Sequence, residues 1–185
     1  MSARATTRDE DHEIIRRVGR GDHAAFRCLV DRYRGPLYGF VLRMVKRRAI
    51  AEELVQETFV RAYRAAPRFE PTASVSTWLF QIAARLAMNE AARAHHAREV
   101  MIDGPDIASN SAGPDAALES LEIGRAIEEA LDQLPPQQRA AVVLARYEEM
   151  SYREIGHVLG ISEGAVDGLL QRARRRLMTA LRPWL

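Results

Sequence analysis

The residues whose chemistry is easiest to interpret are four arginines near the C-terminus: Arg172, Arg174, Arg175 and Arg176. Guanidinium groups bind phosphate oxygens through paired hydrogen bonds, so this cluster predicts contact with a nucleic-acid backbone. The alternative is an ordinary solvated helix end, where basic side chains suit the helix dipole. The outward positions near the start of the same helix would then be placed to reach base edges: Glu163, Gly164, Asp167, Gly168 and Gln171.

The segment around these residues has the pattern of two helices joined by a sharp turn. Ser151, with Glu154 three residues later, forms a capping box that predicts a helix over 152–159. Gly160 suits the turn, and Ser162 can cap the last helix. Apolar residues recur on one face of each helix: Ile155, Val158 and Leu159, then Val166, Leu170, Ala173 and Leu177. The pattern predicts a DNA-binding helix-turn-helix, with a plain helical hairpin as the alternative.

The rest of the chain is also predicted to be helical, in two blocks separated by a linker. In the first block, helices are expected over about 10–18, 23–34, 36–46, 49–65 and 77–98, with a break at Gly35-Pro36 and a cap at Ser76. In the second block, helices are expected over about 122–131, 136–147, 152–159 and 163–181. We therefore expect an all-α protein with two helical domains, at 10–98 and 122–182, joined by a flexible acidic linker at 99–121.

Charge is distributed unevenly along the chain, although the net charge is only +2. Residues 10–98 contain 16 Lys and Arg against 10 Asp and Glu, whereas residues 99–121 contain none against 5. A basic first block suits nucleic acid. The single cysteine, Cys28, is expected to be buried. Because no signal peptide and no run of about 18 apolar residues occur, we expect a cytoplasmic protein without membrane insertion.

Three stretches carry a more specific pattern. They are AEELVQETFVRAYRAAPRFE at 51–70, STWLFQIAARLAMNEAAR at 76–93, and ALDQLPPQQRAAVVLARYEEMSYREIGHVLGISEGAV at 130–166. They resemble the polymerase-docking helix, the promoter-opening helix and the second DNA-binding domain of RNA polymerase sigma factors of the extracytoplasmic-function group. The resemblance covers nearly the whole chain. It implies a protein that binds core RNA polymerase and directs promoter-specific transcription initiation.

The resemblance also implies roles for individual residues. The first domain would bind the clamp helices of core polymerase through Glu52, Glu53, Gln56 and Phe59. It would bind the minus-ten promoter element through Ser76, Thr77, Trp78, Arg85, Asn89 and Arg93. The second domain would bind the polymerase flap, and the minus-thirty-five element through Ser162, Glu163, Asp167, Gln171, Arg172, Arg174, Arg175 and Arg176. An anti-sigma protein that clamps the two domains together is the implied inhibitor.

Promoter opening also requires platforms for unstacked bases, each stacking contact contributing about 1 to 3 kcal/mol. Trp78, Phe80 and Tyr63 are the candidates, although aromatic residues at helical spacing are commonly core residues.

The chain departs from the family pattern at five positions. Arg85 and Asn89 stand where the family usually has Asn and Asp. Asp167, Gly168 and Leu169 replace a basic residue, a serine and an arginine. An aspartate is repelled by phosphates, yet it can accept a hydrogen bond from a cytosine amino group. Leu169 can meet a thymine methyl group, pack on the neighbouring helix or belong to a protein interface.

Three other functions are alternatives to a sigma factor. A sigma-like decoy or adaptor would bind partner proteins without recognising promoters, and the unusual residues 167–169 favour it. A helix-turn-helix repressor would leave the matches in the first block unexplained. An enzyme is the least favoured class: the five histidines form no metal-ligand spacing, and no phosphate-binding loop or activated nucleophile is apparent. No cofactor, metal or catalytic residue is therefore expected.

Overall fold

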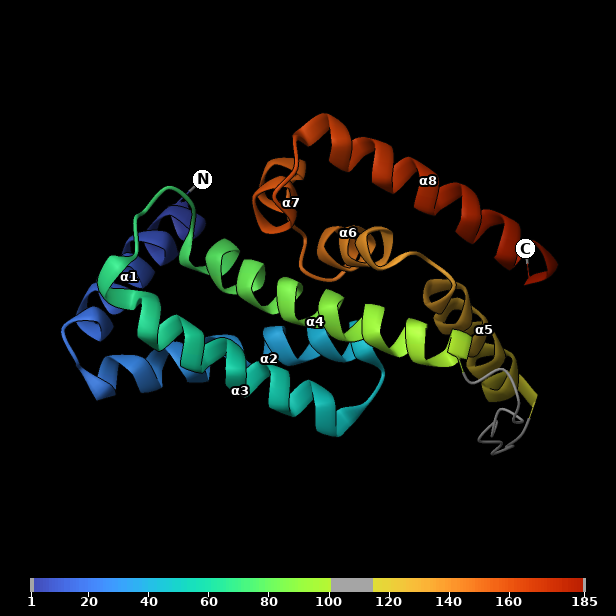
Figure 1. Cartoon of the computed structure of the whole chain (residues 1–185). Coiled ribbons are helices and arrows are strands. Elements are labelled where there is room, and N and C mark those ends of the chain that lie inside the picture. Colours follow the sequence, from blue (N-terminus) through green and yellow to red (C-terminus); the bar gives the residue numbers. More distant parts are fainter. Residues whose placement is uncertain (1, 101–114, 185) are drawn as a thin grey trace.

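A computed structural model describes the backbone of residues 2–100 and 115–184 and the side chains of residues 9–94 and 122–184. Within these ranges the only regular structure is helical (Figure 1). The first block contains α1 (Ser2–Gly19), α2 (His23–Val45), α3 (Arg48–Ala65), the short helix η1 (Ala66–Arg68) and α4 (Val75–Val100). The second contains α5 (Asp115–Asp132), α6 (Pro136–Arg146), α7 (Tyr152–Leu159), α8 (Glu163–Leu181) and the short helix η2 (Arg182–Trp184). The expected all-α class, with two helical parts, is confirmed.

Helix α5 begins earlier than the expected boundary at residue 122. Residues 115–121, which belong to the predicted linker, form its first turns. Ala116, Ala117 and Leu118 have high helix propensity. The rest of the predicted linker, residues 101–114, lies outside the described residues.

The predicted break at Gly35-Pro36 is wrong, because α2 continues through Pro36 as one helix of 23 residues. Proline in a helix interior removes a backbone hydrogen bond and costs about 3 kcal/mol. Side chains on both sides of Pro36 are buried in the same core: Leu29, Tyr33, Leu37, Phe40, Val41 and Met44. Burial of each large apolar side chain contributes about 1.5 to 3 kcal/mol, so packing outweighs the local cost.

The core of the first block includes an aromatic pair from α2 and α4. The rings of Phe40 and Phe80 meet edge to face with their centroids 5.5 Å apart. Both side chains are almost fully buried. Phe80 is therefore a core residue and not a platform for a base.

Helix α1 is joined to α2 by a buried carboxylate. Asp11 is 3% exposed, accepts a hydrogen bond from the Tyr33 hydroxyl and forms an ion pair with Arg32. Burial is the main cause that raises the pKa of Tyr33 far above the ordinary value of 10.0, and the hydrogen bond to Asp11 adds to it. The folded protein therefore favours the neutral phenol.

This shift predicts a pH dependence of stability. The pKa of Tyr33 is higher in the folded than in the unfolded chain. The stabilisation of the folded state that results is therefore complete below about pH 10 and is lost as the pH rises further. Between about pH 10 and 11.5, the free energy of unfolding should fall more steeply for the wild type than for Tyr33→Phe. The extra slope should approach about 1.4 kcal/mol per pH unit. Urea unfolding followed by circular dichroism measures it, and equal slopes would contradict the prediction.

The second block packs on the first through α6 and α7. Figure 1 shows α4 between α3 on one side and α6 and α7 on the other, with α8 farther out. Buried side chains of both blocks belong to one apolar cluster, which includes Leu79 and Ala83 of α4 with Ile155 and Val158 of α7. A smaller cluster contains Leu131, Leu134 and Ala173 within the second block.

Candidate nucleic-acid and protein interfaces

Helices α7 and α8 form the predicted helix-turn-helix. The Ser151 hydroxyl accepts a hydrogen bond from the Glu154 N–H at 3.3 Å, and the Glu154 carboxylate accepts one from the Ser151 N–H at 2.8 Å. Gly160 ends α7 in the left-handed conformation with φ of 67°. The Ser162 hydroxyl then accepts from the Ala165 N–H at 3.3 Å and caps α8. The capping box, the turn and the second cap are all confirmed.

A further glycine sets how closely the turn approaches α7. A Cβ atom on Gly156 would lie 2.7 Å from the Ile161 carbonyl oxygen and 3.8 Å from the Glu163 nitrogen. Two non-bonded carbon and oxygen atoms do not approach to 2.7 Å without strain. The angle between α7 and α8 therefore depends on the missing side chain at residue 156.

Two of the four apolar positions predicted for the inner face of α8, Val166 and Ala173, are buried, and Leu169 is buried in addition. Val166, Leu169 and Ala173 are buried, whereas Leu170 and Leu177 are only partly buried. Leu169 is 7% exposed and belongs to the main apolar cluster. Of its three open roles, packing within the fold is therefore the one observed, and this departure from the family pattern replaces an arginine by a core residue.

The outer face of α8 carries an ordered polar pair. The Gln171 side-chain amide donates a hydrogen bond to Asp167 Oδ2 at 2.8 Å, and Gln171 is exposed. Glu163 is exposed one turn before Asp167. The guanidinium of Arg172 lies over Gly168, since a Cβ atom at residue 168 would be 3.2 Å from Arg172 Nη1. Asp167 and Gln171 are therefore held together as acceptor and donor groups beside an arginine.

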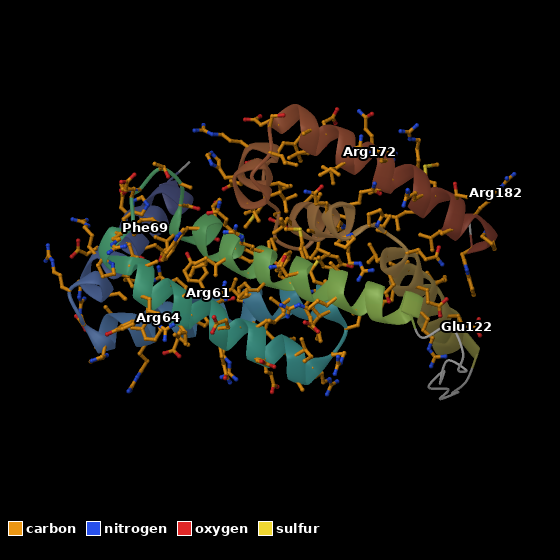
Figure 2. All side chains as sticks on the ribbon, viewed as in Figure 1. Arg61, Arg64, Phe69, Glu122, Arg172 and Arg182 are labelled. Atoms are coloured by element: carbon orange, nitrogen blue, oxygen red, sulfur yellow. The ribbon has the colours of Figure 1, made fainter. Side chains whose placement is uncertain are left out.

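The four arginines do not act as one cluster. Arg172, Arg175 and Arg176 line an open groove of about 600 Å³ between α8 and the end of α5, whereas Arg174 is not part of its lining. A spacing of 100° per residue places Arg174 on the side of α8 that carries Asp167 and Gln171. Figure 2 labels Arg172 on α8. All four side chains are exposed, so each is available to a polyanion.

The predicted minus-ten residues separate into buried and exposed positions. Ser74, not Ser76, caps α4: its hydroxyl accepts a hydrogen bond from the Thr77 N–H at 3.1 Å. The Thr77 side chain is 3% exposed, and its hydroxyl lies 2.8 Å from that of Ser74. Ser76 and Trp78 are partly exposed. Arg85, Asn89 and Arg93 are exposed at intervals of four residues, as expected for one face of α4.

A pocket beside Trp78 contains residues that the sequence analysis did not name. It has a volume of about 390 Å³ and is lined by Arg61, Arg64, Arg68, Phe69 and Trp78, among others. The Phe69 and Trp78 rings lie with their centroids 4.9 Å apart. Figure 2 labels Arg61, Arg64 and Phe69, which lie at the left of the first block in that view. The spacing of the arginines by three and four residues was a signal for it in the sequence. Cations beside two aromatic rings suit a phosphate and an unstacked base.

Tyr63, the other candidate platform, contacts the core instead. Its ring lies 4.9 Å from that of Phe26 and 6.1 Å from that of His23, measured between centroids.

Helix α3 presents a separate polar face. Glu52, Glu53 and Gln56 are exposed, as predicted, but Phe59 is only 6% exposed and packs in the core. Val60, the next residue, is 41% exposed and lies on the face of the two glutamates. Val60 is an exposed apolar side chain on this face that the sequence analysis did not name.

Within the described ranges, no group of three His, Cys, Asp or Glu side chains is arranged to bind a metal ion. Among the described helices, none combines the length and apolar character needed to cross a bilayer. Cys28 is exposed, so its predicted burial is wrong: it lies on the solvent side of α2, away from the stripe of Leu29 and Tyr33.

Comparison with known proteins covers both blocks. The family described as Sigma-70 region 2 matches residues 29–97, and the one described as Sigma-70, region 4 matches residues 124–177. The RNA polymerase sigma-H factor of Pseudomonas aeruginosa is 31% identical, over 97% of this chain and 97% of that protein. The ECF RNA polymerase sigma factor SigW of Bacillus subtilis is also 31% identical, over 91% of this chain and 95% of that protein.

A solved structure extends the likeness to three dimensions. It contains the sigma factor RpoE of Bartonella quintana in complex with the anti-sigma factor NepR. The match has a TM-score of 0.62 and 25% identity, and covers 85% of this chain and 96% of that one. With both sigma-70 regions present in order and sequence likeness along almost the whole length, the chain belongs to the sigma-70 family, as an RNA polymerase sigma factor of the extracytoplasmic-function group.

Proposed function

We propose that the chain recruits core RNA polymerase to promoters through two modules, residues 10–98 at the minus-ten element and residues 122–182 at the minus-thirty-five element. The observation that carries this proposal is the pairing of a capped helix-turn-helix with a separate pocket of three arginines and two aromatic rings. The chain acts by binding and not by catalysis, since its surfaces offer contacts to phosphates, bases and protein. We also infer that the chain acts in the cytoplasm, because the promoters that it would bind are located there.

At the minus-ten element, the first module holds the displaced strand. The guanidinium groups of Arg61, Arg64 and Arg68 attract its phosphates, and Trp78 with Phe69 stacks an unpaired base. Arg85 and Arg93 continue the positive surface along α4. Thr77 contributes by ending the loop before α4 through its bond to Ser74 and not by touching DNA.

At the minus-thirty-five element, the outer face of α8 enters the major groove. Asp167 and Gln171 reach base edges, where Asp167 accepts a hydrogen bond from a cytosine amino group. Arg172, Arg174, Arg175 and Arg176 hold the flanking phosphates. Glu163 and Ser162 lie at the start of the helix, where Ser162 serves as its cap. Polymerase itself is bound by Glu52, Glu53, Gln56 and Val60 of α3.

One experiment tests the function as a whole. The purified chain is added to core RNA polymerase from its own or a related bacterium, and start sites are mapped on a genomic promoter library. A sigma factor initiates at a limited set of sites that share two spaced elements. Absence of any start site, with core binding intact, would instead support the decoy. The burial of Leu169 argues against the decoy, since one of the unusual positions is explained by packing.

Single substitutions in α8 separate affinity from specificity. Arg174→Ala should weaken binding by a similar factor at all promoters and lower the slope of log affinity against log salt by about 1, because one phosphate contact is lost.

Asp167→Ala should change the preferred base at one position more than the overall affinity. Fluorescence anisotropy with duplex variants at several salt concentrations measures both. A uniform gain in affinity for Asp167→Ala would indicate only phosphate repulsion.

An inhibitory partner forms part of the proposal. The Bartonella quintana relative was solved with an anti-sigma factor, and its likeness to this chain extends over both modules. We infer that this chain is also held inactive by an anti-sigma protein. Co-purification of the chain with proteins encoded beside its gene, in the absence of core polymerase, tests the inference.

A further inference from the structure

Helix α1 lies against the connection between α3 and α4, which carries part of the pocket beside Trp78 (Figure 1). This connection consists of η1 and the stretch 69–74, which lies outside the helices. Arg68 of η1 and Phe69, the first residue of the stretch, both line the pocket. Because conformational entropy opposes the ordering of such a loop, it keeps one conformation only where other parts of the fold hold it. The contacts of α1 therefore affect the shape of the pocket.

His12 of α1 contacts this loop near both of its ends. Its Nε2 atom lies 3.4 Å from the carbonyl oxygen of Ala73, and the Nε2–H group is the donor because a carbonyl oxygen only accepts. Its ring centroid lies 5.9 Å from that of Phe69, at an interplanar angle of 53°. The Phe69 ring in turn lies 4.9 Å from that of Trp78, measured between centroids. Ring contacts thus lead from α1 through Phe69 to the pocket.

The end of α1 approaches η1 closely at a glycine. A Cβ atom on Gly19 would lie 3.0 Å from the Ala66 carbonyl oxygen and 3.2 Å from Pro67 Cα. Both atoms belong to the backbone, so neither can rotate aside. Ile15 and Val18 of α1 are buried in the main core and fix the helix from which this contact is made. A side chain at residue 19 would therefore push η1 away from α1.

The contacts of α1 with the loop go beyond what covering the core requires. The buried side chains of Ile15 and Val18 are sufficient for that purpose. A polar ring beside a loop carbonyl and a missing side chain opposite η1 are features of the loop contact alone. The match to Sigma-70 region 2 begins at residue 29, after α1 ends, and the proposed function assigns no contact to this helix.

Resting on the proposed function, we propose that His12 and Gly19 of α1 are positioning residues for the pocket at the minus-ten element. They hold η1 and the loop that follows it, so that Arg68 and Phe69 face a phosphate and an unpaired base. Neither of the two residues touches DNA. Without them the loop must be ordered when DNA binds, and the cost of that ordering is subtracted from the affinity.

The fluorescence of Trp78 tests the positioning without any DNA. All chains carry Trp184→Phe, which leaves Trp78 as the only tryptophan. In His12→Ala, acrylamide should quench Trp78 about twofold faster, because a loosened loop exposes the ring. His12→Gln presents an amide N–H at about the same distance from the backbone as Nε2 and should restore most of the shielding. Glu13→Ala, at an exposed residue of α1, is the control and should resemble the unchanged chain.

Binding of single-stranded DNA gives the functional readout. The probe is a single strand of about 12 nucleotides of randomised sequence, followed by the change in Trp78 emission as bases stack on the ring. His12→Ala and Gly19→Ala should each lose about fivefold in affinity for it. Both should stay within about twofold of the unchanged chain for a labelled duplex, which the arginines of α8 bind. Gly124→Ala is the control for the added methyl group, since a Cβ atom there meets nothing within 4 Å.

The outcomes distinguish this proposal from the proposed function. Equal acrylamide quenching in His12→Ala and Glu13→Ala, or an equal loss of affinity for single strand and duplex, would overturn the positioning role. If the single strand leaves Trp78 emission unchanged in the chain with His12 and Gly19 intact, the proposed minus-ten pocket is refuted instead. The quenching measurement on the free chain then still decides whether His12 holds the loop.

Circular dichroism shows whether each variant is folded. Because His12 is only partly buried, its replacement should leave the helices intact even if Gly19→Ala fails to fold.

Discussion

Alanine at residue 156 is expected to destabilise the second module by about 1 to 3 kcal/mol and to abolish binding to the minus-thirty-five element. The added Cβ atom would lie 2.7 Å from the Ile161 carbonyl oxygen, which belongs to the backbone and cannot rotate away. Alanine is the better helix former by about 1 kcal/mol, so local propensity acts in the opposite direction. The turn must open to relieve the contact, and α8 then leaves the orientation that its core contacts require.

Gly164→Ala is the matched control, because the same methyl group is added to a glycine of the same motif. A Cβ atom there meets nothing within 4 Å, and the residue is exposed in the first turn of α8. This variant should be as stable as the wild type or gain up to about 1 kcal/mol. Urea unfolding monitored by circular dichroism compares the two. Equal stabilities for Gly156→Ala and Gly164→Ala would show that the turn adapts and that the close approach has no role.

Reversing two charges on α3 should cause the largest loss of function. Glu52→Lys/Glu53→Lys is expected to weaken binding to core polymerase by about a hundredfold or more, at about 1.4 kcal/mol for each charge pair at the interface. Both side chains are exposed, so the fold should remain intact. Bio-layer interferometry with immobilised core polymerase measures the affinity, and run-off transcription should decline in parallel.

Glu13→Lys/Asp31→Lys provides a control with the same change in net charge. These residues are exposed on α1 and α2, outside the face of α3 that we assign to polymerase. The control should bind core polymerase within about twofold of the wild type, since distant surface charges are screened by salt. If both double variants lose affinity to the same extent, overall charge and not the α3 face controls binding.

The parts of the fold that were predictable depend on neighbouring residues. The capping box of Ser151 and Glu154, the left-handed Gly160 and the cap at Ser162 are local hydrogen-bonding devices, and the structure contains all of them. The continuation of α2 through Pro36 was not predictable in this way. It depends on side chains on both sides of the proline packing into the same core, a contact made by residues distant in sequence.

The candidate surfaces were predicted less well because exposure is a property of the packed molecule. The family pattern named Phe59 and Thr77, yet both side chains are buried, and exposed Val60 and the pocket of Arg61, Arg64 and Arg68 were overlooked. Helical spacing indicates which residues share a face. It does not indicate which of several faces another helix will cover, and both α3 and α4 are partly covered.

The burial of Leu169 limits how this protein can be re-engineered towards the promoters of its relatives. Grafting the family's residues onto positions 167 and 168 changes side chains at the surface, where only the movable guanidinium of Arg172 must give way. At position 169, the graft would put a permanent positive charge where 93% of the surface is withdrawn from water. Altered promoter choice in this scaffold therefore has to be built from the outer face of α8 alone.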